Sequence, residues 1–254
     1  MNRRSFLKGL LLTGLTGLGL SSLSPKGALS LAFRKKEDFE PPLVNIPVGG
    51  LIRPPGAIPE KEFRAKCISC GVCVNICHSM KYDAIAVVGL SDFRNLGTPY
   101  VKDMRDFPCG LCMECPKNCP TGALKRLDKE KVSMGQALID FSLCFGWNGD
   151  VCLSCSKACP LGAFVFDFYN SQWGNQPYIN ERCVGCGLCV KYCPLGGSAV
   201  KVVKKEVYQR IRPEYDQVFN RLLKMSMEER YLVVYNENLP KILSRGRIHE
   251  REYR

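Results

Sequence analysis

Sixteen cysteines, against only two histidines, constrain this 254-residue chain more than any other feature. They form four groups of four with none left over, and the first cysteines of successive groups lie 42, 35 and 39 residues apart. A unit of about 40 residues is therefore repeated four times. The groups are Cys67-x2-Cys70-x2-Cys73-x3-Cys77, Cys109-x2-Cys112-x2-Cys115-x3-Cys119, Cys144-x7-Cys152-x2-Cys155-x3-Cys159 and Cys183-x2-Cys186-x2-Cys189-x3-Cys193.

The spacing within the groups is that of bacterial-type ferredoxins. Three cysteines at intervals of three residues surround one face of a [4Fe-4S] cluster, and a fourth, placed before a proline, ligates the other cluster of a pair. Pro120, Pro160 and Pro194 follow the last cysteines of groups two, three and four. The pattern therefore predicts four [4Fe-4S] clusters that use all sixteen cysteines as ligands.

Two other uses of cysteine are alternatives. Structural zinc also takes four cysteines with a Cys-x2-Cys pair, but it requires neither a third cysteine at the same interval nor a proline after the fourth. A disulfide framework fits an exported protein, but the ligand spacing argues against it.

The formal net charge of +12 suggests at first a nucleic-acid or anionic-lipid partner. Four oxidised clusters with their thiolates contribute about −8, however. The first 32 residues hold Arg3, Arg4, Lys8 and Lys26 and no acid. Without them the loaded protein is roughly neutral, so no nucleic-acid partner is predicted. The chain also lacks a long apolar run, which argues against a protein that spans the membrane several times.

Residues 1–8 read Met-Asn-Arg-Arg-Ser-Phe-Leu-Lys, followed by a Gly- and Leu-rich stretch. This start resembles a twin-arginine signal peptide with Arg3 and Arg4 as its paired arginines, and residues 1–32 are the expected leader. A basic first turn of an ordinary helix is the alternative. The resemblance implies export of the folded protein by the Tat translocase into the periplasm. There the protein is free, or held at the membrane by its partner or an uncleaved leader.

The predicted fold class is α+β, with duplicated bacterial 2[4Fe-4S] ferredoxin-like units in which short strands and short helices surround the clusters. The four-cluster domain covers residues 61–203. It follows a proline-rich extended arm over residues 33–60 and precedes a helical, basic extension over residues 204–254. Short strand-like stretches flank the cysteine groups. They are residues 84–88, 99–101, 122–124, 137–140, 162–166, 177–180 and 198–203.

Two groups depart from the common pattern. The seven residues between Cys144 and Cys152 form either a neutral surface insertion or a partner-docking loop with Trp147 as its anchor. His78 replaces the proline after Cys77. It is either a solvated or packed histidine or a group that tunes a neighbouring cluster, and it is not needed as a ligand.

The C-terminal extension predicts a helix that begins at Pro213. Its apolar residues fall on one face, so the helix either covers the cluster domain or binds a partner. Residues 231–235 predict a strand or a continuation of the helix. The apolar face consists of Tyr215, Val218, Phe219, Leu222 and Leu223.

The Arg3-Arg4 start, the Cys144-x7-Cys152 stretch and the three Cys-Pro endings together resemble the MauM/NapG family of periplasmic ferredoxin-type proteins. The resemblance implies an electron carrier, not an enzyme. It implies electron transfer from a membrane-bound, NapH-like quinol dehydrogenase to a periplasmic redox acceptor. In the NapG branch, favoured by the chain length and residues 2–6, the acceptor is nitrate reductase. In the MauM branch the context is methylamine oxidation. The alternative is an iron-sulfur subunit of a catalytic complex, a molybdopterin enzyme or hydrogenase.

The spacing leaves open which groups share clusters, because adjacent groups can pair or the middle two can pair inside the outer two. A resemblance to the four-cluster subunits of molybdopterin enzymes implies the nested arrangement. Its ligand sets are Cys67, Cys70, Cys73 and Cys193; Cys183, Cys186, Cys189 and Cys77; Cys109, Cys112, Cys115 and Cys159; and Cys144, Cys152, Cys155 and Cys119.

Overall fold

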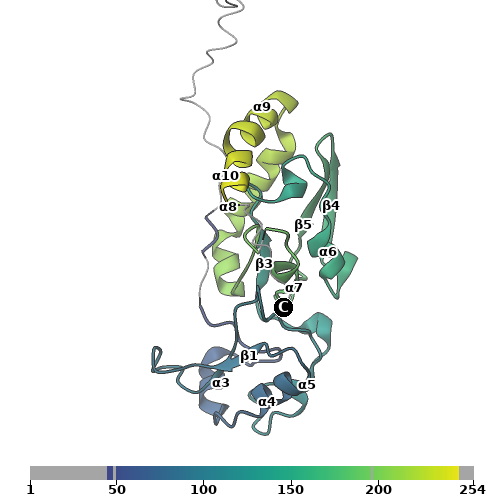
Figure 1. Ribbon diagram of the computed structural model, residues 1–254. Coiled ribbons are helices and arrows are strands. Elements are labelled where there is room, and N and C mark those ends of the chain that lie inside the picture. The colour runs from purple at the N-terminus through teal and green to yellow at the C-terminus, as the bar shows by residue number, and fades with distance from the viewer. Residues whose placement is uncertain (1–44, 48–49, 196, 246–254) are drawn as a thin grey trace, which may run out of the picture. The chain divides into compact units, whose positions relative to one another are not determined.

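The computed structural model describes residues 45–47, 50–195 and 197–245 (Figure 1). The predicted leader with Arg3 and Arg4, the first part of the proline-rich arm and the end of the basic tail lie outside the described residues. Within the described ranges, no helix combines the length and the apolar character needed to cross a membrane.

Residues 57–124, named module 1, contain the first two cysteine groups. Each group continues into a short helix, and the two helices, α4 and α5, pack together. Strands β1 and β2 pair antiparallel between the groups, and an antiparallel bridge between Ala57 and Leu124 joins the two ends of the module. The elements of the module are α3 (Glu60–Lys66), α4 (Val72–Ser79), β1 (Ile85–Val87), β2 (Pro99–Val101) and α5 (Glu114–Lys117).

Residues 136–203, named module 2, repeat this plan with the other two groups. Strands β4 and β5 form the inner hairpin, the outer strands β3 and β6 pair antiparallel, and α6 packs against α7. The duplicated α+β architecture predicted from the sequence is therefore confirmed. The elements are β3 (Gln136–Ile139), α6 (Ser154–Ala158), β4 (Phe166–Ser171), β5 (Gly174–Ile179), α7 (Leu188–Lys191) and β6 (Val200–Val203). Short 3-10 turns are η1 (Lys129–Lys131), η2 (Phe145–Trp147) and η3 (Gly162–Phe164).

Most of the predicted strands form at the expected places. Five of the stretches coincide with β1, β2, β3, β5 and β6 to within one to three residues at their ends. Residues 122–124 contribute only the bridge at Leu124, and residues 162–164 form a 3-10 turn before β4. All four residues of β3 are buried, because the Cys183 sulfur lies on one side at Ala137 and Tyr215 of the C-terminal extension contacts the backbone of Ile139.

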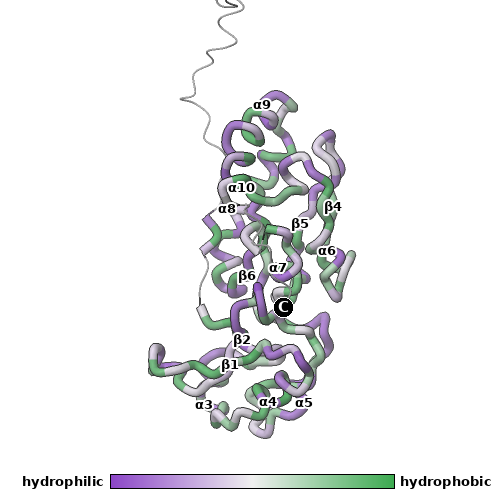
Figure 2. Tube along the Cα trace, viewed as in Figure 1, coloured by the Kyte–Doolittle hydropathy of each residue, from purple (hydrophilic) through white to green (hydrophobic). Residues whose placement is uncertain are grey.

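The described part of the C-terminal extension is helical and packs on module 2 through an aromatic cluster. Polar and apolar residues alternate along its first helix, α8 (Figure 2), and Tyr215 and Phe219 on that helix stack against Phe141. This favours the covering role over partner binding for that face. The elements are α8 (Lys205–Lys224), α9 (Met227–Leu232), the π-helical turn η4 (Val233–Asn238) and α10 (Leu239–Arg245).

The prediction that Pro213 begins the C-terminal helix is wrong. Pro213 lies inside α8, which begins at Lys205. A proline within a helix removes one backbone hydrogen bond and usually destabilises it. Here the buried side chains of Tyr208 and Tyr215 hold the helix to module 2 on both sides of the proline. Residues 231–235 are helical, which is the second of their two predicted alternatives.

Trp147 is fully buried, so the alternative in which it anchors a partner-docking loop is wrong. Its indole N–H donates to the carbonyl of Pro177 at 2.8 Å, and its ring centroid lies 4.6 Å from that of Phe141 and 5.7 Å from that of Phe219. The first part of the stretch between Cys144 and Cys152 therefore folds inward and supplies part of the core beneath the C-terminal helices, whereas its end over residues 149–151 is exposed.

Candidate iron-sulfur sites

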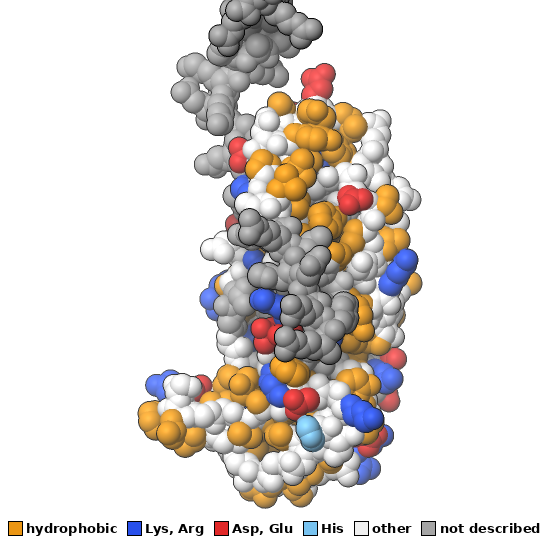
Figure 3. All heavy atoms as spheres, in the orientation of Figure 1, with side chains coloured by type: hydrophobic (Ala, Val, Ile, Leu, Met, Phe, Trp, Pro, Cys, Tyr) orange, Lys and Arg blue, Asp and Glu red, His pale blue; other side chains and the backbone are white. Residues whose placement is uncertain are grey.

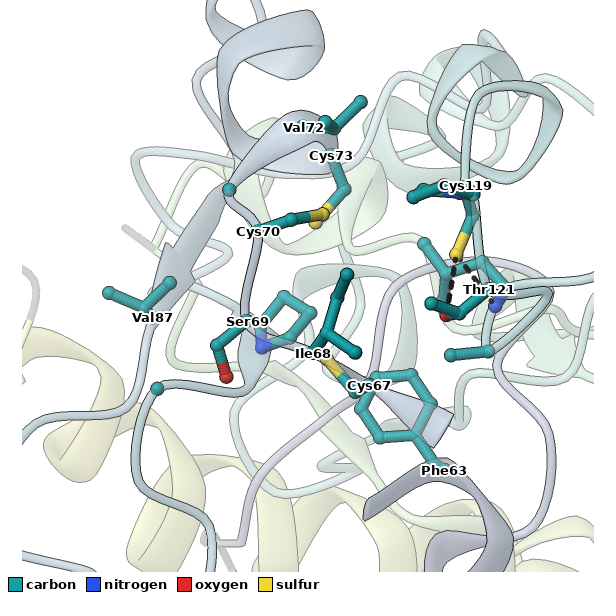
Figure 4. Close-up of a pocket in the computed structure, with 16 residues that line it drawn as sticks. Phe63, Cys67, Ile68, Ser69, Cys70, Val72, Cys73, Val87, Cys119 and Thr121 are labelled. Carbon is teal, nitrogen blue, oxygen red and sulfur yellow. Dashed lines mark hydrogen bonds between the residues drawn. The ribbon is translucent and has the colours of Figure 1, made fainter. Parts of the chain in front are cut away.

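One set of four cysteines surrounds a hollow of about 420 Å³ in module 1. Cys67 and Cys70 line it from the loop before α4 and Cys73 from the first turn of α4, and Cys119 faces them from the loop after α5 (Figure 4). The hollow is therefore lined by the first three cysteines of group one and the last of group two. We name this set site A.

A corresponding hollow of about 320 Å³ lies in module 2. It combines the first three cysteines of group four with the last cysteine of group three. We name this set, which consists of Cys159, Cys183, Cys186 and Cys189, site C.

The remaining eight cysteines form two more sets, in which neighbouring thiols contribute to the raised pKa values of Cys115, Cys144 and Cys155. In module 1, Cys77 lies beside the cysteines of group two. In module 2, Cys193 lies beside Cys152 and Cys155 of group three. Site B consists of Cys77, Cys109, Cys112 and Cys115, and site D of Cys144, Cys152, Cys155 and Cys193.

The nested pairing is wrong, because adjacent groups exchange their fourth cysteines. Cys119, and not Cys193, completes the set of Cys67. Likewise Cys159, and not Cys77, completes the set of Cys183. The reason lies in the outer strands, which pair within one module and bring its end back to its beginning. The sequence left this adjacent arrangement open as an alternative.

The cysteine loops of groups one, two and four pass through left-handed backbone at two equivalent positions. The φ angles are positive at Ser69 and Gly71, at Leu111 and Met113, and at Gly185 and Gly187. For Leu111 and Met113 this conformation costs about 1–2 kcal/mol per residue. Such strain persists only where the surrounding structure enforces it, and it is concentrated at functional sites.

Backbone N–H groups point at several of the sulfurs. Ala84 donates to Cys77 Sγ at 3.2 Å, Leu124 to Cys119 Sγ at 3.5 Å, and Ala137 to Cys183 Sγ at 3.4 Å. Each donor belongs to the strand or bridge that follows a group or pairs across the module. Hydrogen bonds to cluster-bound sulfur are one of the ways in which a protein sets the reduction potential of an iron-sulfur cluster.

Burial keeps most of these thiols protonated. Burial, with a smaller contribution from neighbouring cysteines, raises the pKa of Cys73 to about 11 and the pKa values of Cys109 and Cys186 to about 12. At Cys119 burial also acts to raise the pKa, but hydrogen bonds from Leu124 and Thr121 outweigh it and lower the pKa. Metal ions that bind as thiolate complexes must displace these protons.

The donor sets fit a cluster better than a single ion. Among the residues that the structure describes, no three His, Cys, Asp or Glu side chains converge closely enough to hold one metal ion. A [4Fe-4S] cube is wider than one ion, and four cysteine sulfurs spread around a hollow match it. When bound, such clusters supply one-electron redox chemistry.

Contacts connect the four sites in the order A, B, C, D. Cys73 of site A lies close enough to Cys115 of site B to raise the pKa of the Cys115 thiol. The Cys109 N–H of site B donates to the Cys186 carbonyl of site C at 2.9 Å. Cys155 of site D likewise lies near Cys189 of site C. The sites therefore form a series that passes through both modules.

Site A is the most exposed of the four sites. At site A, Cys70 is exposed and the other three cysteines are half-buried. At site D, Cys144, Cys155 and Cys193 are buried. His78 lies at the surface with its Nδ1 3.5 Å from Asp83, as expected of a solvated histidine.

Arg230 on α9 is a residue that sequence reasoning missed. Its guanidinium is buried and donates to the carbonyls of Trp147 and Leu222 at 2.8 Å each. It also lies over the Trp147 ring at 5.2 Å. Trp147 follows Cys144 by three residues, so the buried guanidinium contacts the segment that carries one ligand of site D. The Glu-Glu-Arg run over residues 228–230 resembles a solvated surface, and no signal in the sequence distinguishes this arginine.

Comparison with known proteins agrees with these sites. The family model of the 4Fe-4S dicluster domain matches residues 66–123, which include both groups of module 1, and the 4Fe-4S binding domain matches residues 177–196. The dicluster match is consistent with adjacent pairing.

Several characterised proteins are similar over most of their length. The methylamine utilization ferredoxin-type protein MauM of Methylobacillus flagellatus is 34% identical over 63% of this chain and 71% of its own. MauM of Methylorubrum extorquens is 36% identical over 61% and 74%. The ferredoxin-type protein NapG of Escherichia coli is 35% identical over 61% and 71%. No solved structure matches the chain.

Proposed function

The chain belongs to the family of ferredoxin-type proteins that includes MauM and NapG, and we propose that it passes electrons through four [4Fe-4S] clusters in the periplasm. It is an iron-sulfur electron-transfer protein and not an enzyme. In the proposal, a membrane-bound quinol dehydrogenase is the electron donor and a periplasmic reductase is the acceptor.

The number of four clusters is supported by the four cysteine sets. Sites A to D account for all sixteen cysteines, and each set combines three cysteines of one group with the fourth of its neighbour. The series of contacts between successive sites is the single observation that carries the proposal, because it gives an electron a path through the chain.

The electron acceptor is proposed from the relatives and from the start of the chain. The relatives divide between MauM and NapG at closely similar identities. We favour the nitrate reductase system on the length of the chain and on the Asn-Arg-Arg-Ser-Phe start at residues 2–6, and methylamine oxidation is the other setting. Export to the periplasm rests on Arg3 and Arg4.

Anaerobic purification of the full chain tests the cofactor content. We expect about sixteen irons and sixteen acid-labile sulfides per chain, and low-temperature EPR of interacting clusters on reduction. Roughly four zinc ions and a colourless protein would contradict the proposal.

The partner is tested separately by adding the loaded protein to membranes of the source organism with duroquinol. Reduction of the clusters supports a quinol dehydrogenase as donor. A molybdenum or nickel subunit that co-purifies in equal amount would instead support a permanent subunit of a catalytic complex. Replacement of both Arg3 and Arg4 by lysine should leave the loaded protein in the cytoplasm.

A further inference from the structure

The loop between β1 and β2 carries three large apolar side chains into solvent. Leu90 is 71%, Phe93 79% and Leu96 46% exposed. The loop projects from module 1 in Figure 1, and hydrophobic atoms cover its end in Figure 3. Contiguous exposed apolar side chains on a soluble domain mark a surface that another molecule covers.

The backbone of this loop is held in place by its own hydrogen bonds. Val88 and Thr98 pair at 2.9 Å, and the Gly97 N–H returns to the Val88 carbonyl at 2.8 Å. The buried guanidinium of Arg53 donates to Thr98 Oγ1, to the Pro99 carbonyl and to Asn95 Oδ1 at 2.8–2.9 Å. The apolar side chains are therefore presented by an ordered framework.

The same loop adjoins site A. Val87 and Gly97 line the hollow that contains Cys67, Cys70 and Cys73. Gly97 has a φ of +73°, and a Cβ there would lie 2.8 Å from Ser69 Oγ, so the loop lies directly against the cysteine loop. Ile68 beside Cys67 is 65% exposed, and Cys70 is exposed too. Apolar side chains therefore flank the most accessible of the four sites.

We propose that this surface is the docking face for the membrane-bound quinol dehydrogenase, so that electrons enter the chain at site A. The docking face consists of Ile68, Val87, Leu90, Phe93 and Leu96. This inference rests on the proposed function and adds to it the place of contact.

The uncharged, apolar composition of the docking face favours a protein partner that forms a long-lived complex. The loop over residues 88–98 contains one acid and one base, Asp92 and Arg94, and therefore has no net charge to steer a mobile partner. Brief redox encounters use small contact areas, whereas long-lived complexes use more hydrophobic interfaces. A donor fixed in the membrane is such a partner, and by covering the face it excludes water from site A.

The test compares two double variants of the loaded full chain. One carries Leu90→Ser with Phe93→Ser. The control carries Leu232→Ser with Leu243→Ser, which removes exposed apolar side chains from α9 and α10. Each protein is added anaerobically to membranes of the source organism with duroquinol, and the bleaching of cluster absorbance is followed.

We expect the loop variant to be reduced at least tenfold more slowly than the wild type, and the control at the wild-type rate. Dithionite should reduce all three proteins fully, which shows that their clusters are intact. Equal rates for the loop variant and the wild type overturn the docking face. If the wild type is not reduced by these membranes at all, the proposed quinol-linked function fails, and the inference fails with it.

Two further results would overturn the inference by identifying another occupant. In one, the wild type is a dimer in solution and the loop variant a monomer, while their reduction rates are equal. In the other, protein-free phosphatidylglycerol vesicles bind the wild type and not the loop variant, again with equal rates.

Discussion

Modules 1 and 2 share one chain plan but differ in what covers their first site. Site A of module 1 and site D of module 2 are equivalent, since each contains three cysteines of the module's first group and the last of its second. Every cysteine of site A is more exposed than its counterpart in site D. The difference arises outside the repeat, because the C-terminal helices pack on Trp147, three residues from Cys144.

The comparison shows that the duplicated unit by itself leaves an edge of its first site open. The extension after β6 closes that edge in module 2, and in module 1 an ordered apolar loop stands beside it instead. The two ends of the series are therefore unequal. An electron donor or acceptor comes closest to a cluster ligand at Cys70.

The largest expected effect tests whether each module holds its own two clusters. In adjacent pairing, Cys67 and Cys119 belong to one site, whereas Cys67 and Cys193 belong to two. The double variant Cys67→Ser with Cys119→Ser should therefore lose one cluster, about four irons, and Cys67→Ser with Cys193→Ser two clusters, about eight irons. Iron and sulfide analysis of the purified proteins measures the difference.

Nested pairing predicts the opposite order for these two variants. Each protein carries two serines in place of cysteines, so the variants serve as controls for each other. Equal iron contents in both would mean that the modules do not hold their clusters independently.

The next largest effect concerns the cover of module 2. Trp147→Ala removes a fully buried side chain that packs on Phe141 and Phe219. Such truncations cost about 3–5 kcal/mol. We expect a lower temperature for the loss of cluster absorbance and for unfolding followed by circular dichroism. Phe93→Ala, which truncates an exposed ring of module 1, should change neither temperature by more than a degree or two. A similar loss in both variants would show that the two modules are covered alike.

Much of this organisation could be predicted from the sequence, because ligand chemistry fixes cysteine spacing. The four groups, the flanking strands and the apolar face of α8 were all evident. The pairing was not, since it depends on which outer strands meet, and loops of similar length allow either arrangement. In module 1 the bridge between Ala57 and Leu124 decides the pairing of the cysteine groups. A contact between only two residues leaves no recognisable pattern in the sequence.

The environment of single side chains was equally hidden. Trp147 lies in a polar, glycine-containing stretch that is typical of a surface loop, yet the C-terminal helices bury it. Arg230 follows two acidic residues and looks solvated, yet its guanidinium is enclosed by distant segments. Both outcomes depend on tertiary packing between residues more than 80 positions apart, which local patterns do not report.

A smaller effect tests the charge buried against Trp147, three residues from Cys144 of site D. Burial lowers the pKa of Arg230 to about 10, so the side chain remains protonated at pH 7. Its positive charge favours the addition of an electron nearby. Arg230→Met should lower the midpoint potential of the site D cluster by tens of millivolts, since about 1–2 kcal/mol corresponds to ~40–90 mV for one electron. Redox titration followed by EPR measures the shift.

Arg230→Lys keeps the charge and should restore most of the potential. Arg212→Met, at an exposed arginine of α8, is the matched control and should leave every potential unchanged. If Arg230→Met instead shifts the midpoint potential of the signal assigned to site A, the conclusion that sites A and D lie in different surroundings is wrong.

The smallest effect compares one motif position in the two modules. Ile68 and Val184 each follow the first cysteine of a group, but Ile68 is 65% and Val184 3% exposed. Val184→Ala removes two buried methyl groups and should lower the free energy of unfolding by about 1.5 kcal/mol, at ~0.8 kcal/mol per buried carbon. Ile68→Ala should change stability by less than about 0.5 kcal/mol, as surface substitutions usually do. Thermal loss of cluster absorbance under anaerobic conditions measures both.

A substantial loss of stability in Ile68→Ala would break the comparison. It would mean that Ile68 is covered in solution by another part of the chain or by a second copy, and that site A is no more open than site C. If Ile68→Ala is as stable as the wild type but is reduced more slowly by quinol-treated membranes, the exposed isoleucine acts through contact with a partner. A surface that matters for the rate of electron entry and not for folding is what the unequal covering of the two modules predicts.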